Sequence, residues 1–177
     1  MKISVYIAVS LDGFIARKDG GLDWLPPGSD GSEDYGYAEF MSTVDIIVMG
    51  RNSFEKVLTF GEWPYDKKVI VLTSRDLTRP PELADKVEAL HLSPRELVHE
   101  MDIRGATGIY LDGGITIQHF LREGLVDEMT ITTIPILIGD GLLLFGSLEK
   151  DVKLELIKSP SFKNGFVQNK YKVMSGR

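Results

Sequence analysis

The chain has 177 residues, with 20 Lys and Arg against 26 Asp and Glu, a formal net charge of −6 and no cysteine. Domains usually run to about 100–200 residues, so residues 1–177 are predicted to form a single domain. The acidic balance argues against nucleic acid and membrane surfaces as partners, because both attract basic proteins. The lack of cysteine excludes disulfides, thiolate metal sites and a cysteine nucleophile, and it fits a cytoplasmic location.

Apolar strands alternate with helical stretches along the first two thirds of the chain. The first apolar run, 3–9, is too short for a signal peptide or a membrane span and is predicted to be a core strand. Further buried strands are expected at 45–49, 68–72 and 108–111, and helices at 33–43, 52–58, 94–101 and 115–123. This alternation is typical of α/β proteins with a mostly parallel sheet.

Two helix ends are marked by specific residues. Ser93 precedes Pro94 and is followed three residues later by Glu96, which predicts a capping box at the start of the helix at 94–101. Gly124 is placed to end the helix at 115–123.

The last third of the chain has the alternation of antiparallel strands. A strand is expected at 128–134, where Pro135 ends it. Alternation returns at 152–156 and in 166–173, and Asn164-Gly165 between them is the strongest short signal for a hairpin. The sequence therefore predicts that the chain ends in an antiparallel pair.

An irregular segment and three strand ends hold the candidate functional residues. Segment 10–32 is too long for an ordinary loop, which favours a functional one. The three predicted strand ends lead into Gly50-Arg51-Asn52-Ser53, into Thr73-Ser74-Arg75, and into Asp112-Gly113-Gly114 before Ile115. Ligands of α/β proteins bind at the carboxyl ends of strands, and helix N-termini and Arg side chains suit phosphates.

Each junction alone is also explained by a capped turn, a polar loop or a tight glycine turn. Together they favour an extended ligand with several phosphates, of which a dinucleotide is the simplest. Other chemistry lacks its motif: there is no Gly-x-Ser-x-Gly, Walker loop or Gly-x-Gly-x-x-Gly, and the three histidines do not have metal-ligand spacing. No metal site is therefore predicted.

Five motifs resemble the dihydrofolate reductase fold in order and spacing, over essentially the whole chain. They lie at 8–16 (AVSLDGFIA), 21–26 (GLDWLP), 48–53 (VMGRNS), 72–75 (LTSR) and 112–114 (DGG). Ser10-Leu11-Asp12-Gly13 and the run 120–128 (FLREGLVDE), followed by 135–139, are similar to one branch. That branch is the reductase (C-terminal) domain of the bacterial riboflavin-biosynthesis deaminase-reductase and its stand-alone relatives. The resemblance implies a three-layer α/β fold with helices on both faces of the sheet.

The resemblance also implies NADPH as the cofactor and assigns residues to it. Arg51 with Thr73, Ser74 and Arg75 would lie near the adenosine 2′-phosphate, which favours NADPH over NADH. Gly113 and Gly114 would lie against the pyrophosphate and the nicotinamide ribose. The complete expected set is Ala8, Ile15, Trp24, Gly50, Arg51, Asn52, Ser53, Thr73, Ser74, Arg75, Asp112, Gly113, Gly114 and Ile115.

For activity, the resemblance implies hydride transfer to a small heterocycle, as in 5-amino-6-(5-phosphoribosylamino)uracil reduction. Asp34, counted back without a gap from Met49, is one candidate for the catalytic carboxylate, and Asp12 is the other. Their alternatives are an acid favoured at a helix start and a turn residue. Arg17 and Lys18 could bind a substrate phosphate or form a solvated turn. A true dihydrofolate reductase and a non-catalytic ligand-binding protein stay open as alternative functions.

Two apolar stretches, 134–138 and 142–145, exceed what one sheet face needs. Relatives of this branch often pair, so we expect a homodimer that uses this surface; the alternative is a buried core strand.

Overall fold

The computed structural model describes residues 1–26 and 33–174. Its helices are α1 (Tyr37–Ser42), α2 (Arg51–Leu58), η1 (Pro81–Leu83, a 3-10 helix), α3 (Pro94–Ile103) and α4 (Gly114–Arg122). Its strands are β1 (Lys2–Ser10), β2 (Phe14–Ala16), β3 (Ile46–Gly50), β4 (Lys68–Leu72), β5 (Val87–Leu90), β6 (Gly108–Asp112), β7 (Glu128–Ile134), β8 (Leu142–Leu143), β9 (Leu154–Lys158) and β10 (Val167–Val173). Within these described ranges no helix has the length and apolar character needed to cross a membrane.

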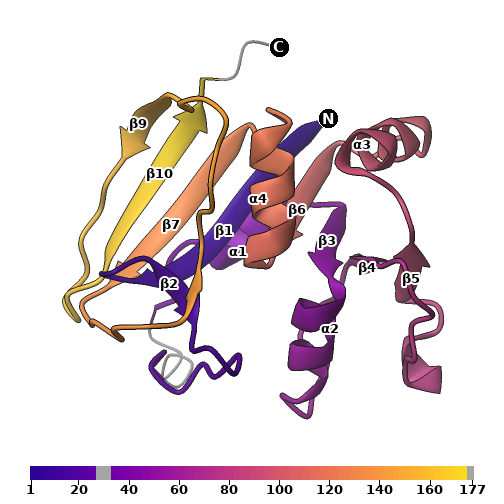
Figure 1. Ribbon diagram of the computed structural model, residues 1–177, viewed down its shortest axis with the longest axis horizontal. Coiled ribbons are helices and arrows are strands. Elements are labelled where there is room, and N and C mark those ends of the chain that lie inside the picture. Colours follow the sequence, from indigo (N-terminus) through magenta and orange to yellow (C-terminus); the bar gives the residue numbers. More distant parts are fainter. Residues whose placement is uncertain (27–32, 175–177) are drawn as a thin grey trace.

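An eight-stranded sheet in the order β5-β4-β3-β6-β1-β7-β10-β9 forms the centre of the molecule (Figure 1). The strands from β5 to β7 run parallel to one another, whereas β10 is antiparallel to both β7 and β9. Asn164 and Gly165 lie in the turn between β9 and β10, where the Gly165 N–H donates to the Phe162 carbonyl. The predicted α/β class, the mostly parallel sheet and the final antiparallel pair are confirmed.

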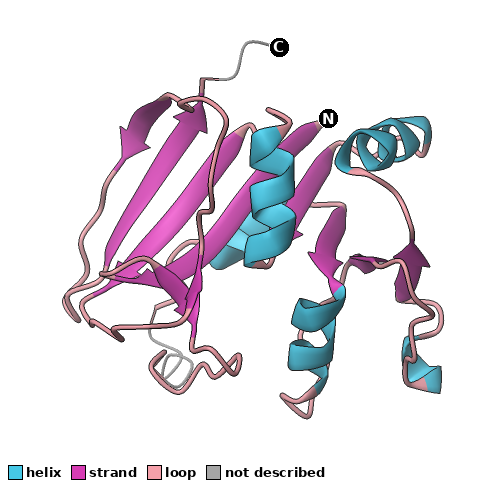
Figure 2. Ribbon diagram, viewed as in Figure 1, coloured by secondary structure: helices cyan, strands magenta, loops and turns pink. Residues whose placement is uncertain are grey.

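Helices cover both faces of this sheet and make three layers (Figure 2). Side chains of α3 and α4 pack in the larger core cluster, and those of α1 and α2 pack in a second cluster on the other face. Strand β6 contributes side chains to both core clusters, because alternate residues of a strand point to opposite faces of the sheet. Ile109 and Leu111 belong to the first cluster, and Tyr110 belongs to the second.

The first helix is shorter than the sequence predicted. Helix α1 begins at Tyr37 rather than at residue 33, because Tyr35 (φ 55°) and Gly36 (φ 81°) take left-handed conformations that cannot continue a helix. The Asp34 carboxylate accepts hydrogen bonds from the backbone N–H groups of Gly36 (2.9 Å) and Ala38 (3.0 Å). The acid therefore ties down the turn ahead of the helix instead of lying in its first turn.

The sheet order brings the three predicted junctions together. Strands β4, β3 and β6 are neighbours, and β1 lies next to β6. Because these strands are parallel, their carboxyl ends lie at the same edge of the sheet. The last residues of the four strands are Leu72 (β4), Gly50 (β3), Asp112 (β6) and Ser10 (β1).

Candidate active site

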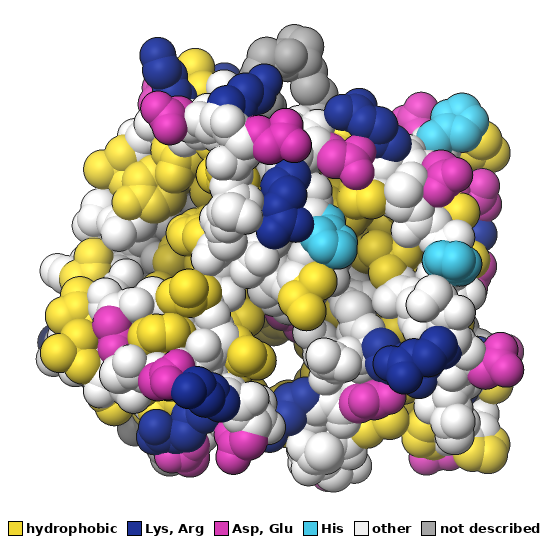
Figure 3. All heavy atoms as spheres, in the orientation of Figure 1, with side chains coloured by type: hydrophobic (Ala, Val, Ile, Leu, Met, Phe, Trp, Pro, Cys, Tyr) yellow, Lys and Arg dark blue, Asp and Glu magenta, His cyan; other side chains and the backbone are white. Residues whose placement is uncertain are grey.

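A cavity of about 960 Å³ lies at this edge of the sheet. It is lined by the ends of β1, β3, β4 and β6, by the first turns of α2 and α4, and by the segment that contains β8. Figure 3 shows the molecule hollowed on this face below α4. The sequence-predicted residues that line it are Ala8, Ile15, Gly50, Arg51, Asn52, Ser53, Thr73, Ser74, Asp112, Gly113, Gly114 and Ile115.

Two helices begin at the cavity wall without a capping side chain. Gly50 precedes α2 and Gly113 precedes α4; the Gly113 N–H donates to Asp112, and no side chain of the described residues caps the N–H groups within either helix. Such N–H groups, together with the positive end of the helix dipole, favour an anion. The cavity therefore has two backbone sites suited to phosphate groups.

The glycines of the second junction are required by close packing. A Cβ atom on Gly113 would lie 2.2 Å from the Ser53 Oγ, and Gly113 also has a φ of +85°, a conformation that side chains rarely adopt. A Cβ atom on Gly114 would lie 2.8 Å from the Ile15 Cδ1. Only glycine at both positions lets the backbone of this turn lie open to the cavity.

Arg51 lines the cavity, but its guanidinium is largely used inside the protein. Its Nε donates to the Thr73 Oγ1 (3.1 Å), and its Nη2 donates to the carbonyls of Arg75 (2.8 Å) and Asp76 (2.5 Å). Its Nη1 lies 3.4 Å from Glu55. Arg51 thus holds the loop after β4 against α2, with Thr73 and Ser74 at the cavity wall, whereas the exposed Arg75 is not among the lining residues.

The loop after β2 contributes its leucines to the cavity rather than its tryptophan. Trp24 is 6% exposed and packs with Ile134 and Phe166, where its Nε1 finds no hydrogen-bond partner among residues 1–26 and 33–174. Leu22 and Leu25 of the same loop line the cavity beside Ala8 and Ile15. The expected apolar wall is present, but Trp24 supports it from behind.

Among the described residues, Asp112 is the carboxylate that lines the cavity. Its Oδ1 accepts from the Gly113 N–H (2.8 Å), and the Tyr65 hydroxyl lies 3.4 Å from its Oδ2. Burial raises the pKa of the Asp112 carboxyl, and these two hydrogen bonds offset part of that rise. A carboxyl with a raised pKa beside a cavity is a candidate proton donor.

The two predicted catalytic acids lie outside the cavity. Asp12 accepts from the Ser10 Oγ (2.5 Å) and from the N–H groups of Gly139 (2.8 Å) and Ile138 (3.3 Å). The Ser10 hydroxyl is the main cause of its lowered pKa. The backbone N–H of Ala38 is the main cause of the lowered pKa of Asp34. Both carboxylates are thus engaged in turn structure.

Several lining residues were missed in the sequence. Lys56 and Val57 follow Ser53 at helical spacing, so the same helix face could have been extended to them. Phe60 and Tyr65 come from the segment between α2 and β4, which has no periodic pattern, and Tyr6 and Tyr110 lie within predicted core strands. Only the first pair had a signal in the sequence.

Comparison with known proteins shows the family. The model of the RibD C-terminal domain matches residues 1–168. The uncharacterized protein YwjB of Bacillus subtilis (strain 168) is 37% identical over 166 residues, which are 91% of this chain and 92% of that protein.

Solved structures show the same fold. A candidate riboflavin biosynthesis protein from Shewanella sp. PV-4 superposes with a TM-score of 0.91 at 41% identity, over 98% of this chain and 99% of that one. Dihydrofolate reductase from Enterococcus faecalis, complexed with NADP(H) and RAB-propyl, superposes with a TM-score of 0.69 at 18% identity, over 98% and 96%. The chain therefore belongs to the RibD C-terminal domain family, a reductase family with the dihydrofolate reductase-like fold that the sequence motifs indicated.

Proposed function

We propose that the protein is an NADPH-dependent reductase that transfers a hydride to a small heterocycle of the aminopyrimidine or pteridine class. The observation that carries this proposal is that the N-termini of α2 and α4 and the carboxyl of Asp112 open onto the same cavity. Membership of a reductase family supports the reaction type, the cofactor and the substrate class are those that the resemblance implies, and the lining of the cavity fits the cofactor.

The residues present fit a dinucleotide phosphate. The first turns of α2 and α4 offer N–H groups to the pyrophosphate, and Gly113 and Gly114 leave room for it. The Ser74 hydroxyl, in the loop that Arg51 holds in place through Thr73, would meet the 2′-phosphate. When bound, NADPH supplies the hydride, and the protein supplies position and surroundings.

An apolar wall would keep water from the reacting rings. Ala8 and Ile15 from the β1–β2 region and Leu22 and Leu25 from the following loop line one side of the cavity. Rings held between such side chains are oriented for transfer at little further entropic cost, and the polar groups beside them act in a drier environment.

Asp112 would supply the proton that accompanies the hydride. Burial favours its protonated form, and the Tyr65 hydroxyl lies 3.4 Å from its Oδ2. A heterocycle nitrogen beside this carboxyl could receive the proton as the ring is reduced. The position of Asp34 outside the cavity favours this chemistry over that of a true dihydrofolate reductase, for which Asp34 was the expected acid.

The cofactor is tested by titrating the protein with NADPH and NADH while following nicotinamide fluorescence. We expect saturable binding that is tighter for NADPH. Gly113→Ala should weaken it at least about tenfold, a loss of about 1.4 kcal/mol, because the new methyl displaces Ser53. Gly105→Ala is the matched control, since Gly105 has a similar φ of +76° but open space around it.

Turnover then separates the alternatives. NADPH oxidation by 5-amino-6-(5-phosphoribosylamino)uracil but not by dihydrofolate is the expected result. Preference for dihydrofolate would identify a true dihydrofolate reductase, and ligand binding without oxidation of NADPH would identify a binding protein. The absence of saturable binding of either nucleotide would refute the cofactor assignment.

A further inference from the structure

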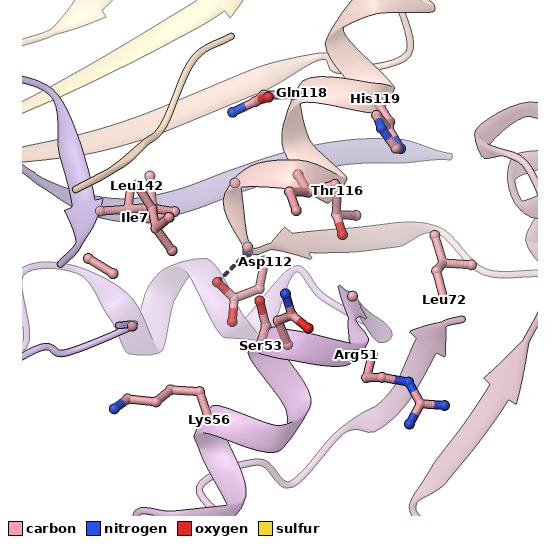
Figure 4. A pocket seen from close by; sticks show the side chains of 18 of the residues that line it. Ile7, Arg51, Ser53, Lys56, Leu72, Asp112, Thr116, Gln118, His119 and Leu142 are labelled. Carbon is pink, nitrogen blue, oxygen red and sulfur yellow. Dashed lines mark hydrogen bonds between the residues drawn. The ribbon is translucent and has the colours of Figure 1, made fainter. Parts of the chain in front are cut away.

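Two cationic side chains of helix α2, Arg51 and Lys56, point in opposite directions. Figure 4 shows Arg51 extending toward Leu72, while Lys56 extends the other way, below Asp112. Arg51 is used in holding the loop after β4. Lys56 lines the cavity one helical turn beyond Ser53, and its ammonium takes part in none of the ion pairs found among residues 1–26 and 33–174.

The two cations considered for a substrate phosphate, with a solvated turn as the alternative, are already paired. Arg17 donates to both carboxylate oxygens of Asp23, at 2.7 and 2.9 Å, and Lys18 forms an ion pair with Asp140. Lys56 is close enough to Asp23 to contribute to its lowered pKa, although the hydrogen bond from Arg17 is the main cause. Because Asp23 is already bound by Arg17, Lys56 has no ion-pair partner of its own within the described part of the chain.

Apolar residues share the cavity with Lys56. Val57 and Phe60 follow it in the chain, and Leu22 and Leu25 also line the cavity; apolar side chains near a charge reduce its screening. A ligand that places an anion beside the ammonium gains a charge-assisted hydrogen bond there. In a chain of net charge −6, this cation is a local exception on the cavity wall.

We propose that Lys56 binds an anionic substituent of the substrate while the heterocycle lies toward Asp112. This inference rests on the proposed function, because that function places the reacting ring beside Asp112. The anion is a phosphate monoester or a carboxylate, since both accept hydrogen bonds from an ammonium. Lys56 thereby selects heterocycles with an acidic tail over their neutral counterparts.

The test compares ligand pairs that differ in the anion alone. Isothermal titration of the protein, with and without saturating NADP⁺, uses 5-amino-6-(ribosylamino)uracil against its 5′-phosphate, and the neutral carboxamide of dihydropteroate against dihydropteroate itself. We expect the anionic member of one pair to bind about tenfold or more tightly, as charged hydrogen bonds commonly provide. The preferred pair distinguishes phosphate from carboxylate.

Variants connect this preference to Lys56. Lys56→Gln should abolish the difference within the pair, and Lys56→Arg should retain most of it. Lys18→Gln removes the same charge from a lysine that pairs with Asp140 outside the cavity lining, and it should leave the preference intact. Equal affinities within both pairs, or an anion preference that survives Lys56→Gln, would overturn the inference.

These outcomes are distinct from failure of the proposed function. Binding of NADPH and of heterocycles without an anion preference would refute the role of Lys56 and leave the reductase proposal standing. An anion preference lost in Lys56→Gln, in a protein that binds neither NADPH nor NADH, would support Lys56 as the anion contact and refute the cofactor assignment.

Discussion

Three carboxylates illustrate how environment decides the role of one residue type. Asp112 ends β6 inside the cavity, and burial raises its pKa. Asp12 and Asp34 accept several hydrogen bonds in turns, and their pKa values are lowered. A general acid must hold its proton near the working pH. The environment of Asp112 suits this task, whereas the environments of the other two oppose it.

The raised pKa of Asp112 predicts a trade between stability and activity. A carboxyl whose pKa is raised on folding stabilises the folded state fully below its unfolded value, near 3.8, and loses that contribution as pH rises through the folded value. Asp112→Asn should therefore raise the midpoint of thermal unfolding at neutral pH, with a smaller advantage below pH 3.8. Turnover should fall about 100- to 10,000-fold, as for loss of a general acid.

Asp85→Asn is the matched control for Asp112→Asn, because it removes an exposed carboxylate away from the cavity. It accounts for the general effect of one negative charge less in an acidic chain. Thermal unfolding across the pH range is measured for both variants. A stabilisation of Asp85→Asn equal to that of Asp112→Asn would contradict the assigned burial of Asp112.

At the scale of single residues, the sequence predicted which residues line the cavity better than it predicted what each of them does. Residues 50–53 and 112–115, at the two glycine junctions, line the cavity as the motifs predicted. Their glycines are needed for close backbone packing, and such glycines can be recognised in the local sequence. The acid of the cavity was assigned to the cofactor instead. Its chemistry depends on burial and on Tyr65, which joins it from a segment 47 residues away in the chain. Neither condition has a local signal.

At the scale of elements, Asp12 connects two segments that frame the cavity. Its oxygens accept from the Ser10 hydroxyl at the end of β1 and from the N–H groups of Ile138 and Gly139 in the connection after β7. That connection continues into β8, which pairs with β2 and contributes Leu142 and Leu143 to the cavity wall. Asp12 thus fixes one wall without touching the cavity.

This geometry predicts a structural effect for Asp12→Asn. The new amide would direct an NH₂ group at a backbone N–H, so one hydrogen bond is lost and two donors oppose each other. We expect a lower midpoint of thermal unfolding and faster hydrogen exchange at Ile138 and Gly139. The pH dependence of turnover should stay that of the unmodified protein.

The exposed Asp151 supplies the control, since Asp151→Asn removes the same charge from a residue that is not among those lining the cavity. A catalytic role would give the opposite pattern for Asp12→Asn: unchanged exchange rates, unchanged unfolding and a loss of turnover. That pattern would refute the structural interpretation.

Elements with local signals were predicted well, and elements made by tertiary contacts were not. The capping box of α3 is present: the Ser93 Oγ accepts from the Glu96 N–H, and the Glu96 carboxylate accepts from the Ser93 N–H at 2.8 Å. Strands β2 and β8 have three and two residues and exist through their mutual pairing. Too few residues remain for an alternation to show.

For the whole molecule, exposed apolar side chains concentrate in the last third of the chain. Of the stretches predicted for an interface, Ile134 and Leu144 are buried, whereas Leu137, Leu142 and Leu143 are exposed. Figure 3 shows hydrophobic side chains gathered on the side that carries β9 and β10. Strand β9 is the edge of the large sheet, and all five of its residues are exposed. An apolar sheet edge of this kind favours association.

We propose that a second copy of the chain covers this surface, and the homodimer is tested by light scattering at micromolar concentration. The mass should be twice the 19.7 kDa of one chain. Leu137→Glu should shift the protein to the single-chain mass, because a charge buried in an apolar interface is costly. Ile103→Glu is the matched control: Ile103 is as exposed as Leu137, at 68%, but lies at the end of α3.

The pair of variants separates a specific interface from general stickiness. If any exposed apolar side chain promoted association, both substitutions would reduce the mass. If the apolar surface that includes Leu137 and β9 is the interface, the Ile103→Glu variant keeps the dimeric mass and the Leu137→Glu variant loses it. A single-chain mass for the unmodified protein would refute the homodimer. In that case the apolar edge at β9 would have to be tolerated in a monomer, where the charged neighbours Lys153, Glu155 and Lys158 would oppose edge-to-edge pairing.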